Sequence, residues 1–382
     1  MWVKEVGMIG GGAGFALISM LFLCWLAPRL GLIDHPVGRK VHAAPTPLVG
    51  GLSIALAAVL ALTLGAVLDP QVSLAFEGSR YIGLIIGAVG LLCLGGIDDR
   101  TPLPAKVKLA GQVIFCLGAI FIDGVMIGNI GVHIGPLSLS LGPFLVPVTL
   151  LVMVTIINAL NMIDGVDGLA AGIAFCALAI MTKAAIAAQF HSEAFLLCAL
   201  IGAVAGFLLF NFPIWPGRKV GIFLGDGGTL LLGFLVAYFA ISLSAVPHRV
   251  FRPSTAIWFF FIPVADAMLL YLRRTLMDRA PFRPGRDHIH HIVLHHLPPW
   301  LATWVLVTAS AALAGTAYAA ERLGVRPIWL LSGWIVLFVC YAAITQSGWR
   351  AAWLRSHRGP AAPAETDQPQ DAPRLSVEPE RP

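Results

Sequence analysis

The chain has 382 residues, of which 58% are hydrophobic and only 12% are charged. This composition excludes an ordinary soluble domain and predicts a polytopic membrane protein. The net charge of +5 does not indicate a nucleic-acid partner, because lysine and arginine gather at the cytoplasmic ends of membrane spans, beside anionic headgroups.

Eleven apolar stretches are long enough to cross a bilayer as helices. In chain order they are expected at residues 7–27, 47–68, 80–97, 106–122, 143–160, 169–188, 194–212, 222–244, 255–272, 301–319 and 327–345. The first stretch lacks an Ala-x-Ala cleavage pattern, so we expect a retained span and not a cleaved signal peptide. The predicted fold class is an all-α polytopic membrane protein with about 11 transmembrane helices.

We expect one transmembrane catalytic domain over residues 1–346 and a tail over residues 347–382. The tail is Pro-rich and has too little apolar surface to fold, which predicts disorder. The six cysteines all fall inside predicted spans without a Cys-x-x-Cys pair. They are expected to pack as small apolar residues, neither forming disulfides nor binding metal.

The distribution of lysine and arginine predicts the orientation, since basic residues near span ends remain on the cytoplasmic side. Most of the 25 basic residues fall in the loops after the first, third, seventh and ninth spans and in the tail. The N-terminus is therefore expected outside and the C-terminal tail in the cytoplasm.

Five polar clusters lie on the predicted cytoplasmic face. In chain order they contain Lys40; Asp98 and Asp99; Asn158, Asn161, Asp164 and Asp167; Gly225 and Asp226; and Arg286, His288, His290 and His291. Charged groups beside a bilayer are costly, so such clusters indicate a functional site. A transporter or flippase, the competing class, would concentrate polar residues near the bilayer midplane. The pattern favours a membrane enzyme with a cytoplasmic-face active site.

The carboxylates in these clusters suit a cation or a phosphate ester. Adjacent Asp98 and Asp99 repel each other unless a cation or proton lies nearby, which favours a metal or general-base role over the alternative of a hydrated loop end. The i, i+3, i+6 spacing of Asn161, Asp164 and Asp167 would line one face of a helix or helical turn.

Asp226 follows Gly225 at the predicted start of a span, where free backbone N–H groups attract an anion. The bland alternative is a simple helix N-cap. A carboxylate beside such a turn suits a Mg2+-bridged diphosphate, because Mg2+ takes a few protein oxygens together with substrate phosphate.

Other polar residues have plainer alternatives. The histidines at 288–296 suggest zinc at first sight, but the adjacent Arg279, Arg283 and Arg286 would repel a cation and attract phosphate. Lys40 and Lys108 could be ordinary positive-inside anchors. We expect Asp266 and Gln112 to be satisfied packing contacts within the bundle, and we assign no chemistry to Asp123 or His133, which lie on the outer side.

Residues 30–296 resemble the polyprenyl-phosphate N-acetylhexosamine-1-phosphate transferases, which form glycosyltransferase family 4. The motifs that carry the resemblance are Asp98-Asp99, the run Asn-Ala-Leu-Asn-x-x-Asp-Gly-x-Asp-Gly-Leu-Ala that ends at Ala170, the turn at 223–226, and the His-Ile-His-His at 288–291. The last motif is similar to that of the WecA-like branch, which transfers GlcNAc-1-phosphate to undecaprenyl phosphate. The muramoyl-pentapeptide branch has a different histidine motif.

The resemblance implies roles for individual residues. Catalytic roles fall to Asp98, Asp99, Asp164, Asp167, His290 and His291; substrate binding to Lys40, Lys108, Asn158, Arg286 and His288; and metal binding to Asp226 and Asn161. The implied cofactor is Mg2+, with Mn2+ as an alternative. We expect Asp98 and Asp99 to position the lipid phosphate more than to deprotonate it, because a phosphate monoester with a second pKa near 6 is already mostly dianionic at neutral pH.

The resemblance also implies the partners. They are UDP-GlcNAc, undecaprenyl phosphate and the lipids of a bacterial inner membrane, with a homodimer left open and no nucleic acid. The expected products are undecaprenyl-diphosphate-GlcNAc and UMP, the first membrane step of an envelope polysaccharide. Another UDP-N-acetylhexosamine is the alternative donor, and a route through an aspartyl-phosphate is the alternative to direct displacement.

Overall fold

The computed structural model describes residues 2–34, 45–76, 81–134, 137–218, 220–245, 249–276 and 288–357, and it is almost entirely helical. The helices are α1 (Trp2–Leu30), α2 (Gly50–Leu68), α3 (Pro70–Ala75), α4 (Ile82–Arg100), α5 (Ala105–Asp123), α6 (Leu145–Ile163), α7 (Leu169–Ala187), α8 (His191–Asn211), α9 (Gly225–Ser244), α10 (Pro253–Ala256), α11 (Phe261–Leu276), α12 (Ile289–Leu294), α13 (Pro299–Arg322) and α14 (Pro327–His357). Eleven of the described helical segments are long and apolar enough to span a membrane. The predicted fold class is confirmed.

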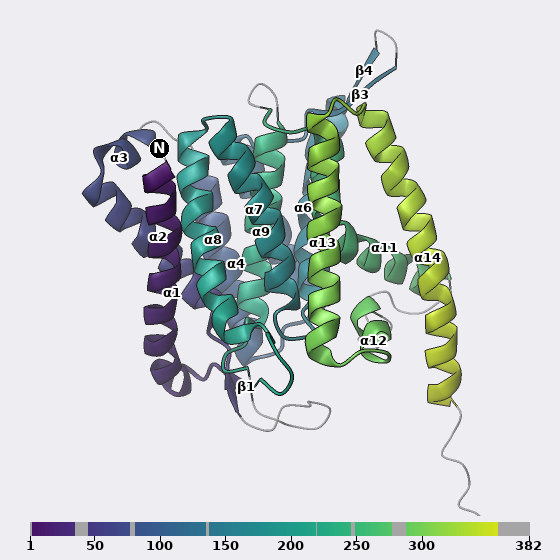
Figure 1. The fold of residues 1–382 in the computed structure, drawn as a ribbon, viewed down its shortest axis with the longest axis horizontal. Helices are drawn as coiled ribbons and strands as arrows, with labels where there is room; N and C mark the ends of the chain where they lie inside the picture. Colours follow the sequence, from purple (N-terminus) through teal and green to yellow (C-terminus); the bar gives the residue numbers. More distant parts are fainter. Residues whose placement is uncertain are drawn as a thin grey trace, which may run out of the picture.

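Short strands and 3-10 turns join the helices. The strands form two antiparallel pairs, β1 (Ile33–Asp34) with β2 (Thr46–Pro47) and β3 (Asn129–Ile134) with β4 (Leu137–Ser140). The 3-10 turns are η1 (Gly142–Phe144) and η2 (Ile257–Phe260). The β3–β4 hairpin projects from the end of the bundle that also holds the N-terminus, on the other side of the molecule, whereas β1 and α12 lie at the opposite end (Figure 1).

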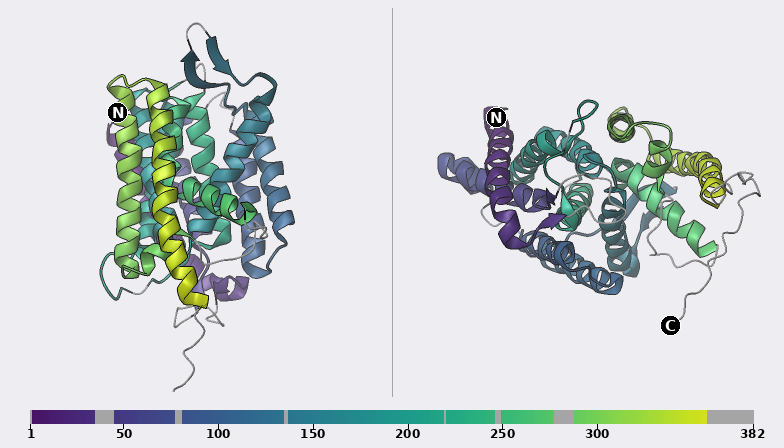
Figure 2. Two further views of the ribbon diagram at one scale, coloured as in Figure 1. Left: turned by 90° about the vertical axis from the view of Figure 1, so that its right-hand side faces the viewer. Right: turned by 90° about the horizontal axis from the view of Figure 1, so that it is seen from below.

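Helix α9 is the centre of the bundle. It packs against α2, α4, α6 and α7, and 94% of its apolar window is buried, compared with 11% for α14 at the periphery. The view along the bundle shows the other helices surrounding it (Figure 2). Residues at the N-terminus of α9 are therefore placed by several neighbouring helices at once.

Glycines bring three helices together at the N-terminal end of α9. A Cβ added to Gly51 of α2 would collide with the backbone of Gly228, and one added to Gly95 of α4 would lie 2.5 Å from the carbonyl carbon of Asp226. Backbone hydrogen bonds from Gly50 N–H to Phe223 O (3.0 Å) and from Gly51 N–H to Leu224 O (3.1 Å) hold the segment that leads into α9. Close backbone approach of this kind requires glycine.

A substitution at Gly51 tests this packing. Gly51→Ala is expected to lower the free energy of unfolding by about 1–3 kcal/mol, because an extra methyl group in a filled contact forces the backbones apart. Thermal unfolding in detergent measures the change. Gly10→Ala is the matched control, since a Cβ at Gly10 meets nothing within 4 Å, and equal loss in both variants would contradict the close-packing role.

The ninth predicted span is not one straight helix. It is divided into α10, η2 and α11, and α11 lies across the bundle instead of along it (Figures 1 and 2). Pro263, near the start of α11, has no N–H to donate to the preceding turn, which is a common cause of such a break. At the end of the chain, α14 continues to His357, beyond position 347 where we placed the start of the tail. Residues 358–382 lie outside the described residues.

Candidate active site

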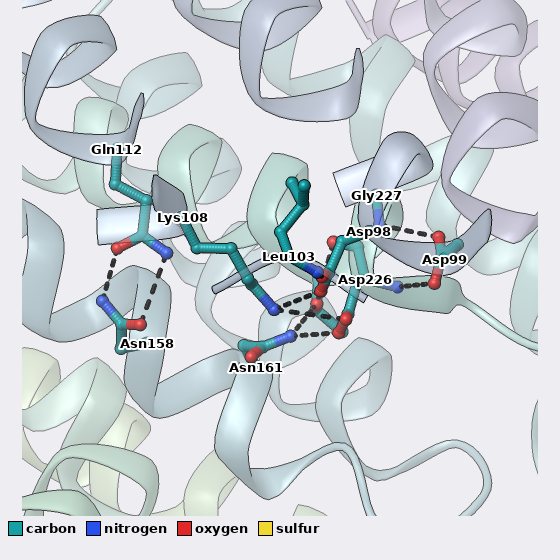
Figure 3. A network of polar contacts seen from close by, with 10 residues as sticks. Asp98, Asp99, Leu103, Lys108, Gln112, Asn158, Asn161, Asp226 and Gly227 are labelled. Carbon is teal, nitrogen blue, oxygen red and sulfur yellow. Dashed lines mark hydrogen bonds and ion pairs between the residues drawn. The ribbon is translucent and has the colours of Figure 1, made fainter. Parts of the chain in front are cut away.

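Four side chains from four helices form a continuous polar chain where α4 and α6 end and α9 begins (Figure 3). Lys108 of α5 forms an ion pair with Asp98 of α4, with 2.6 Å between Nζ and Oδ2, and reaches Asp226 of α9 at 3.2 Å. The other oxygen of Asp226 accepts a hydrogen bond from Asn161 of α6 at 2.6 Å. The structure thus brings together residues predicted for phosphate binding and for metal binding.

The paired aspartates lie in the last turn of α4, which ends at Arg100, and not in the loop that the predicted span boundary at 97 implied. Their partners differ. Asp98 accepts from Leu103 N–H at 2.6 Å and binds Lys108, whereas Asp99 accepts from the backbone N–H groups of Asp226 at 2.8 Å and Gly227 at 3.1 Å. Asp99 therefore caps α9 from a neighbouring helix, a favourable arrangement for an anion at a helix N-terminus.

Exposure separates the two carboxylates that contact Lys108. The side chain of Asp226 is 36% exposed and that of Asp98 is 8% exposed. Asp226 can therefore meet a substrate or ion from solvent while its other contacts hold it in place. A second hydrogen bond holds Asn161 in place, because its side-chain amide also donates to the Thr229 hydroxyl at 2.7 Å.

The spacing predicted that Asn161, Asp164 and Asp167 line one face of a helix or helical turn. Only Asn161 lies in a helix, and Asp164 and Asp167 lie in the non-helical turn that follows it. Helix α6 ends at Ile163, and the chain turns through Gly168, whose φ of +74° is in the left-handed region, before α7 begins. Asn211 fixes this turn by accepting from Gly168 N–H at 2.8 Å and donating to Ile222 O at 2.8 Å. Thr303 of α13 donates to the Asp167 carbonyl at 3.0 Å.

The turn belongs to the same electrostatic cluster as the paired aspartates. Burial raises the pKa of Asp164 to about 8, and the negative charges of Asp226, Asp167 and Asp99 add to the effect. Like charges gathered in a poorly solvated site disfavour ionisation of the carboxylate that they surround. An additional cation at this site would relieve that repulsion.

The histidine motif packs against this turn. His288 and His290 stack nearly parallel, with ring centroids 5.4 Å apart, and the His290 and His291 centroids are 4.2 Å apart. A Cβ on Gly165 would collide with Nε2 of His290, so glycine lets the imidazole lie directly on the turn. Sequence reasoning predicted this room for close approach, but it did not predict that a histidine fills it.

Asp266 of α11 contacts the first histidine of the motif. Its Oδ2 lies 2.8 Å from His288 Nδ1. The expectation that Asp266 is a satisfied contact is confirmed, but its connection to the histidine motif was missed. Only its position within an apolar span could have drawn attention to it.

Several predicted residues stand apart from the cluster. The amide of Asn158 is paired with Gln112, at 2.6 Å and 3.3 Å, and also donates to Val154 O, so its donors are already used within the bundle (Figure 3). Asp123, at the other end, accepts from Gly83 N–H, Leu84 N–H and the Tyr238 hydroxyl. Lys40 and Arg286 lie outside the described residues.

The donors gathered here are carboxylate and amide oxygens, the type of ligand that a hard cation such as Mg2+ takes. Over the described ranges, no group of three or more His, Cys, Asp or Glu side chains has the geometry to hold a metal ion. Two carboxylates converge on one ammonium group at Lys108, and Mg2+ takes few protein oxygens when a substrate diphosphate supplies others. Asp226 and Asn161 are the residues that would hold the ion.

His290 makes stability sensitive to acid. Burial lowers its pKa to about 3, and the neighbouring His291 and His288 add to the effect. The folded protein keeps this ring neutral while the unfolded chain takes up a proton below about pH 6.5, so stability falls as the pH drops. Between pH 7.5 and pH 5, wild type is expected to lose roughly 2 kcal/mol of stability relative to His290→Gln. The comparison removes the opposite contribution of Asp164, whose raised pKa is common to both proteins. Thermal unfolding in detergent at the two pH values measures this difference, with the exposed His296→Gln as control; the same pH dependence in wild type and His290→Gln would contradict the assignment.

The sequence is also similar to those of known proteins. The model of the family described as "Glycosyl transferase family 4" matches residues 81–244. An undecaprenyl-phosphate alpha-N-acetylglucosaminyl 1-phosphate transferase from Yersinia pestis is 30% identical over 342 residues, covering 88% of this chain and 91% of that protein. Proteins of the same name from Salmonella typhi and Escherichia coli K12 are 31% and 29% identical, with 88% of this chain and 90% of each relative covered.

Proposed function

We propose the function of this chain from one premise, that it belongs to glycosyl transferase family 4. It is a multi-pass bacterial membrane protein that transfers N-acetylglucosamine-1-phosphate to undecaprenyl phosphate, as the names of its relatives describe for them. The donor is UDP-GlcNAc, and the products are undecaprenyl-diphosphate-GlcNAc and UMP. The observation that carries the proposal is the convergence of Asp98, Lys108, Asn161 and Asp226 at one end of the bundle.

The location of the cluster suits two anionic substrates. The ends of α4, α6 and α9 meet there, so a nucleotide sugar can arrive from water and a lipid phosphate from the bilayer. The N-terminus of α1 lies at the opposite end (Figure 1), which agrees with an outside N-terminus and a cytoplasmic site in the inner membrane. A transporter would instead carry its polar groups near the midplane.

The chain's own residues then have distinct tasks. Lys108 neutralises phosphate charge beside Asp98, while Asp99 holds the first turn of α9 and so fixes the position of Asp226. Mg2+ held by Asp226 and Asn161 would supply charge stabilisation for the diphosphate. Asp164 and Asp167 orient the nucleotide, and His290 and His291 contact the diphosphate or sugar. Attack by the lipid phosphate on the sugar-linked phosphorus mainly requires alignment and charge neutralisation.

The experiment is UMP release by the purified protein. Undecaprenyl phosphate, Mg2+ and one UDP-sugar at a time are supplied, with controls that lack lipid or contain EDTA. Release that requires lipid, metal and UDP-GlcNAc is the expected result. Release with only another UDP-N-acetylhexosamine would keep the chemistry and change the donor, whereas no release from folded protein would refute the proposal. The homodimer stays a prediction.

A further inference from the structure

The carboxylate of Asp266 connects three separate segments. Its Oδ2 lies 2.8 Å from Nδ1 of His288, while its Oδ1 accepts from Ile289 N–H at 2.8 Å and from the Tyr341 hydroxyl at 2.9 Å. Asp266 is 6% exposed and His288 is 8% exposed. A buried carboxylate is costly unless several donors offset its desolvation. Here the acceptor, Asp266, lies on α11. Its partners come from the start of α12 and from α14.

The contact with Asp266 also determines how His288 can act. A carboxylate at Nδ1 keeps a proton on that nitrogen, so only Nε2 remains to meet another group. His288 stacks on His290, with 8° between the rings, and His290 lies against Gly165 in the turn that carries Asp164 and Asp167. The orientation set at Asp266 therefore extends through two imidazoles to the carboxylate turn.

His290 shows why this orientation matters. His290 is 2% exposed, and within the described ranges its Nδ1 has no hydrogen-bond partner. A buried nitrogen without a partner usually finds one in a bound ligand or water. The stacked ring of His288 and the turn at Gly165 together hold this nitrogen in place.

Helix α14 contributes although it is the least buried of the eleven candidate spans. Besides the Tyr341 hydroxyl, α14 receives hydrogen bonds from Arg273 of α11, whose Nη2 donates to Thr345 Oγ1 at 2.9 Å and to Ala342 O at 3.4 Å. These contacts attach α14 to the helix that carries Asp266. Asp266, His288 and Tyr341 all lie beyond residues 81–244, the segment that matches the family model.

We propose that Asp266 is a positioning residue for this reaction, acting through His288, with Tyr341 of α14 as its support. The proposal rests on the proposed function above. Asp266 fixes the protonated nitrogen of His288 and the start of α12, and through them the place of His290 and His291 beside the Asp164–Asp167 turn. It does not itself touch a substrate.

The primary test is Asp266→Asn in the UMP-release assay. Asparagine keeps the size of the side chain, but its amide can donate to His288 Nδ1 and so shift the imidazole proton to Nε2. We expect kcat to fall by about 10–100-fold. The rise in KM for UDP-GlcNAc should be smaller, because substrate-binding groups elsewhere in the site are unchanged. Tyr341→Phe removes one of three donors and should lower kcat less.

A double-mutant cycle separates positioning from general damage. If Asp266 acts through His288, the kcat of the double variant Asp266→Asn, His288→Gln should lie within about 3-fold of the kcat of the slower single variant. If the fold-losses in kcat of the two single variants multiply in the double variant, the proposal is overturned. If Asp266→Asn does not give folded protein, the cycle is run with Tyr341→Phe and His288→Gln under the same criterion.

Asp123 offers a matched control. It also accepts from two backbone N–H groups and a tyrosine hydroxyl, those of Gly83, Leu84 and Tyr238, but it lies at the opposite end of the bundle without a histidine. Asp123→Asn should lower thermal stability while leaving turnover per folded molecule near wild type. Equal turnover loss in both variants, or an Asp266→Asn variant as active as wild type, would refute the role of Asp266. A wild type that releases no UMP would refute the proposed function instead.

Discussion

Asp226→Asn is expected to lower turnover by at least about 1000-fold, a loss on the scale of removing a principal electrostatic group from an active site. Asp226 contacts Lys108 and Asn161 and keeps 36% exposure of its side chain, so it is the anchored carboxylate that solvent can reach. The amide keeps the shape of the side chain but removes the charge. UMP release measures the effect, together with the Mg2+ concentration that gives half-maximal rate.

The control for Asp226 is Asp69→Asn. Asp69 also pairs with a lysine, Lys4, with 2.5 Å between Nζ and Oδ2, and it caps α3, near the N-terminus of α1 and away from the cluster (Figure 1). We expect that variant to keep normal turnover. Both proteins should insert and purify alike. Full activity in Asp226→Asn would contradict its assignment to the metal and to the reaction.

Lys108→Met is expected to cost about 1–3 kcal/mol of stability when EDTA is present, because removing one partner of a partly buried ion pair leaves the Asp98 carboxylate poorly solvated and without its cation. Lys108 is 18% exposed and contacts both Asp98 and Asp226. Added Mg2+ should recover part of the loss by supplying positive charge to the same carboxylates. Thermal unfolding in detergent, with EDTA and with Mg2+, measures both effects.

Lys4→Met provides the comparison for Lys108. The Lys4–Asp69 pair is more exposed, at 33% and 26%, so its loss should cost no more than about 1 kcal/mol, and Mg2+ should change nothing. If Lys108→Met unfolds at the wild-type temperature in EDTA, the carboxylates of Asp98 and Asp226 do not depend on that lysine for neutralisation.

The histidine motif illustrates a limit of sequence reasoning. The stretch from His288 to His296 suggested zinc or phosphate from its composition alone. In the structure its first member faces Asp266, which is 22 positions earlier, and Asp266 in turn binds Tyr341, which is 75 positions later. No spacing rule connects such residues, because the contact depends on how α11 crosses the bundle.

The amide pair of Asn158 and Gln112 shows the same limit. Asn158 stands three positions before Asn161 within one motif, and both were assigned to the site. Asn161 reaches Asp226, whereas Asn158 binds Gln112 of α5. Their separation depends on which neighbouring helix each side chain meets, and the motif itself contains no information about those neighbours.

The sequence by itself determined the membrane class, the eleven spans and the gathering of polar residues at one end of the bundle. These properties follow from the partition of side chains between lipid and water, which depends on composition along a single segment. The tertiary structure alone decided the separate tasks of Asp98 and Asp99. Consecutive residues in a helix point about 100° apart, so Asp98 faces Lys108 while Asp99 faces the N-terminus of α9, and only the packing of α4, α5 and α9 places a partner in each direction.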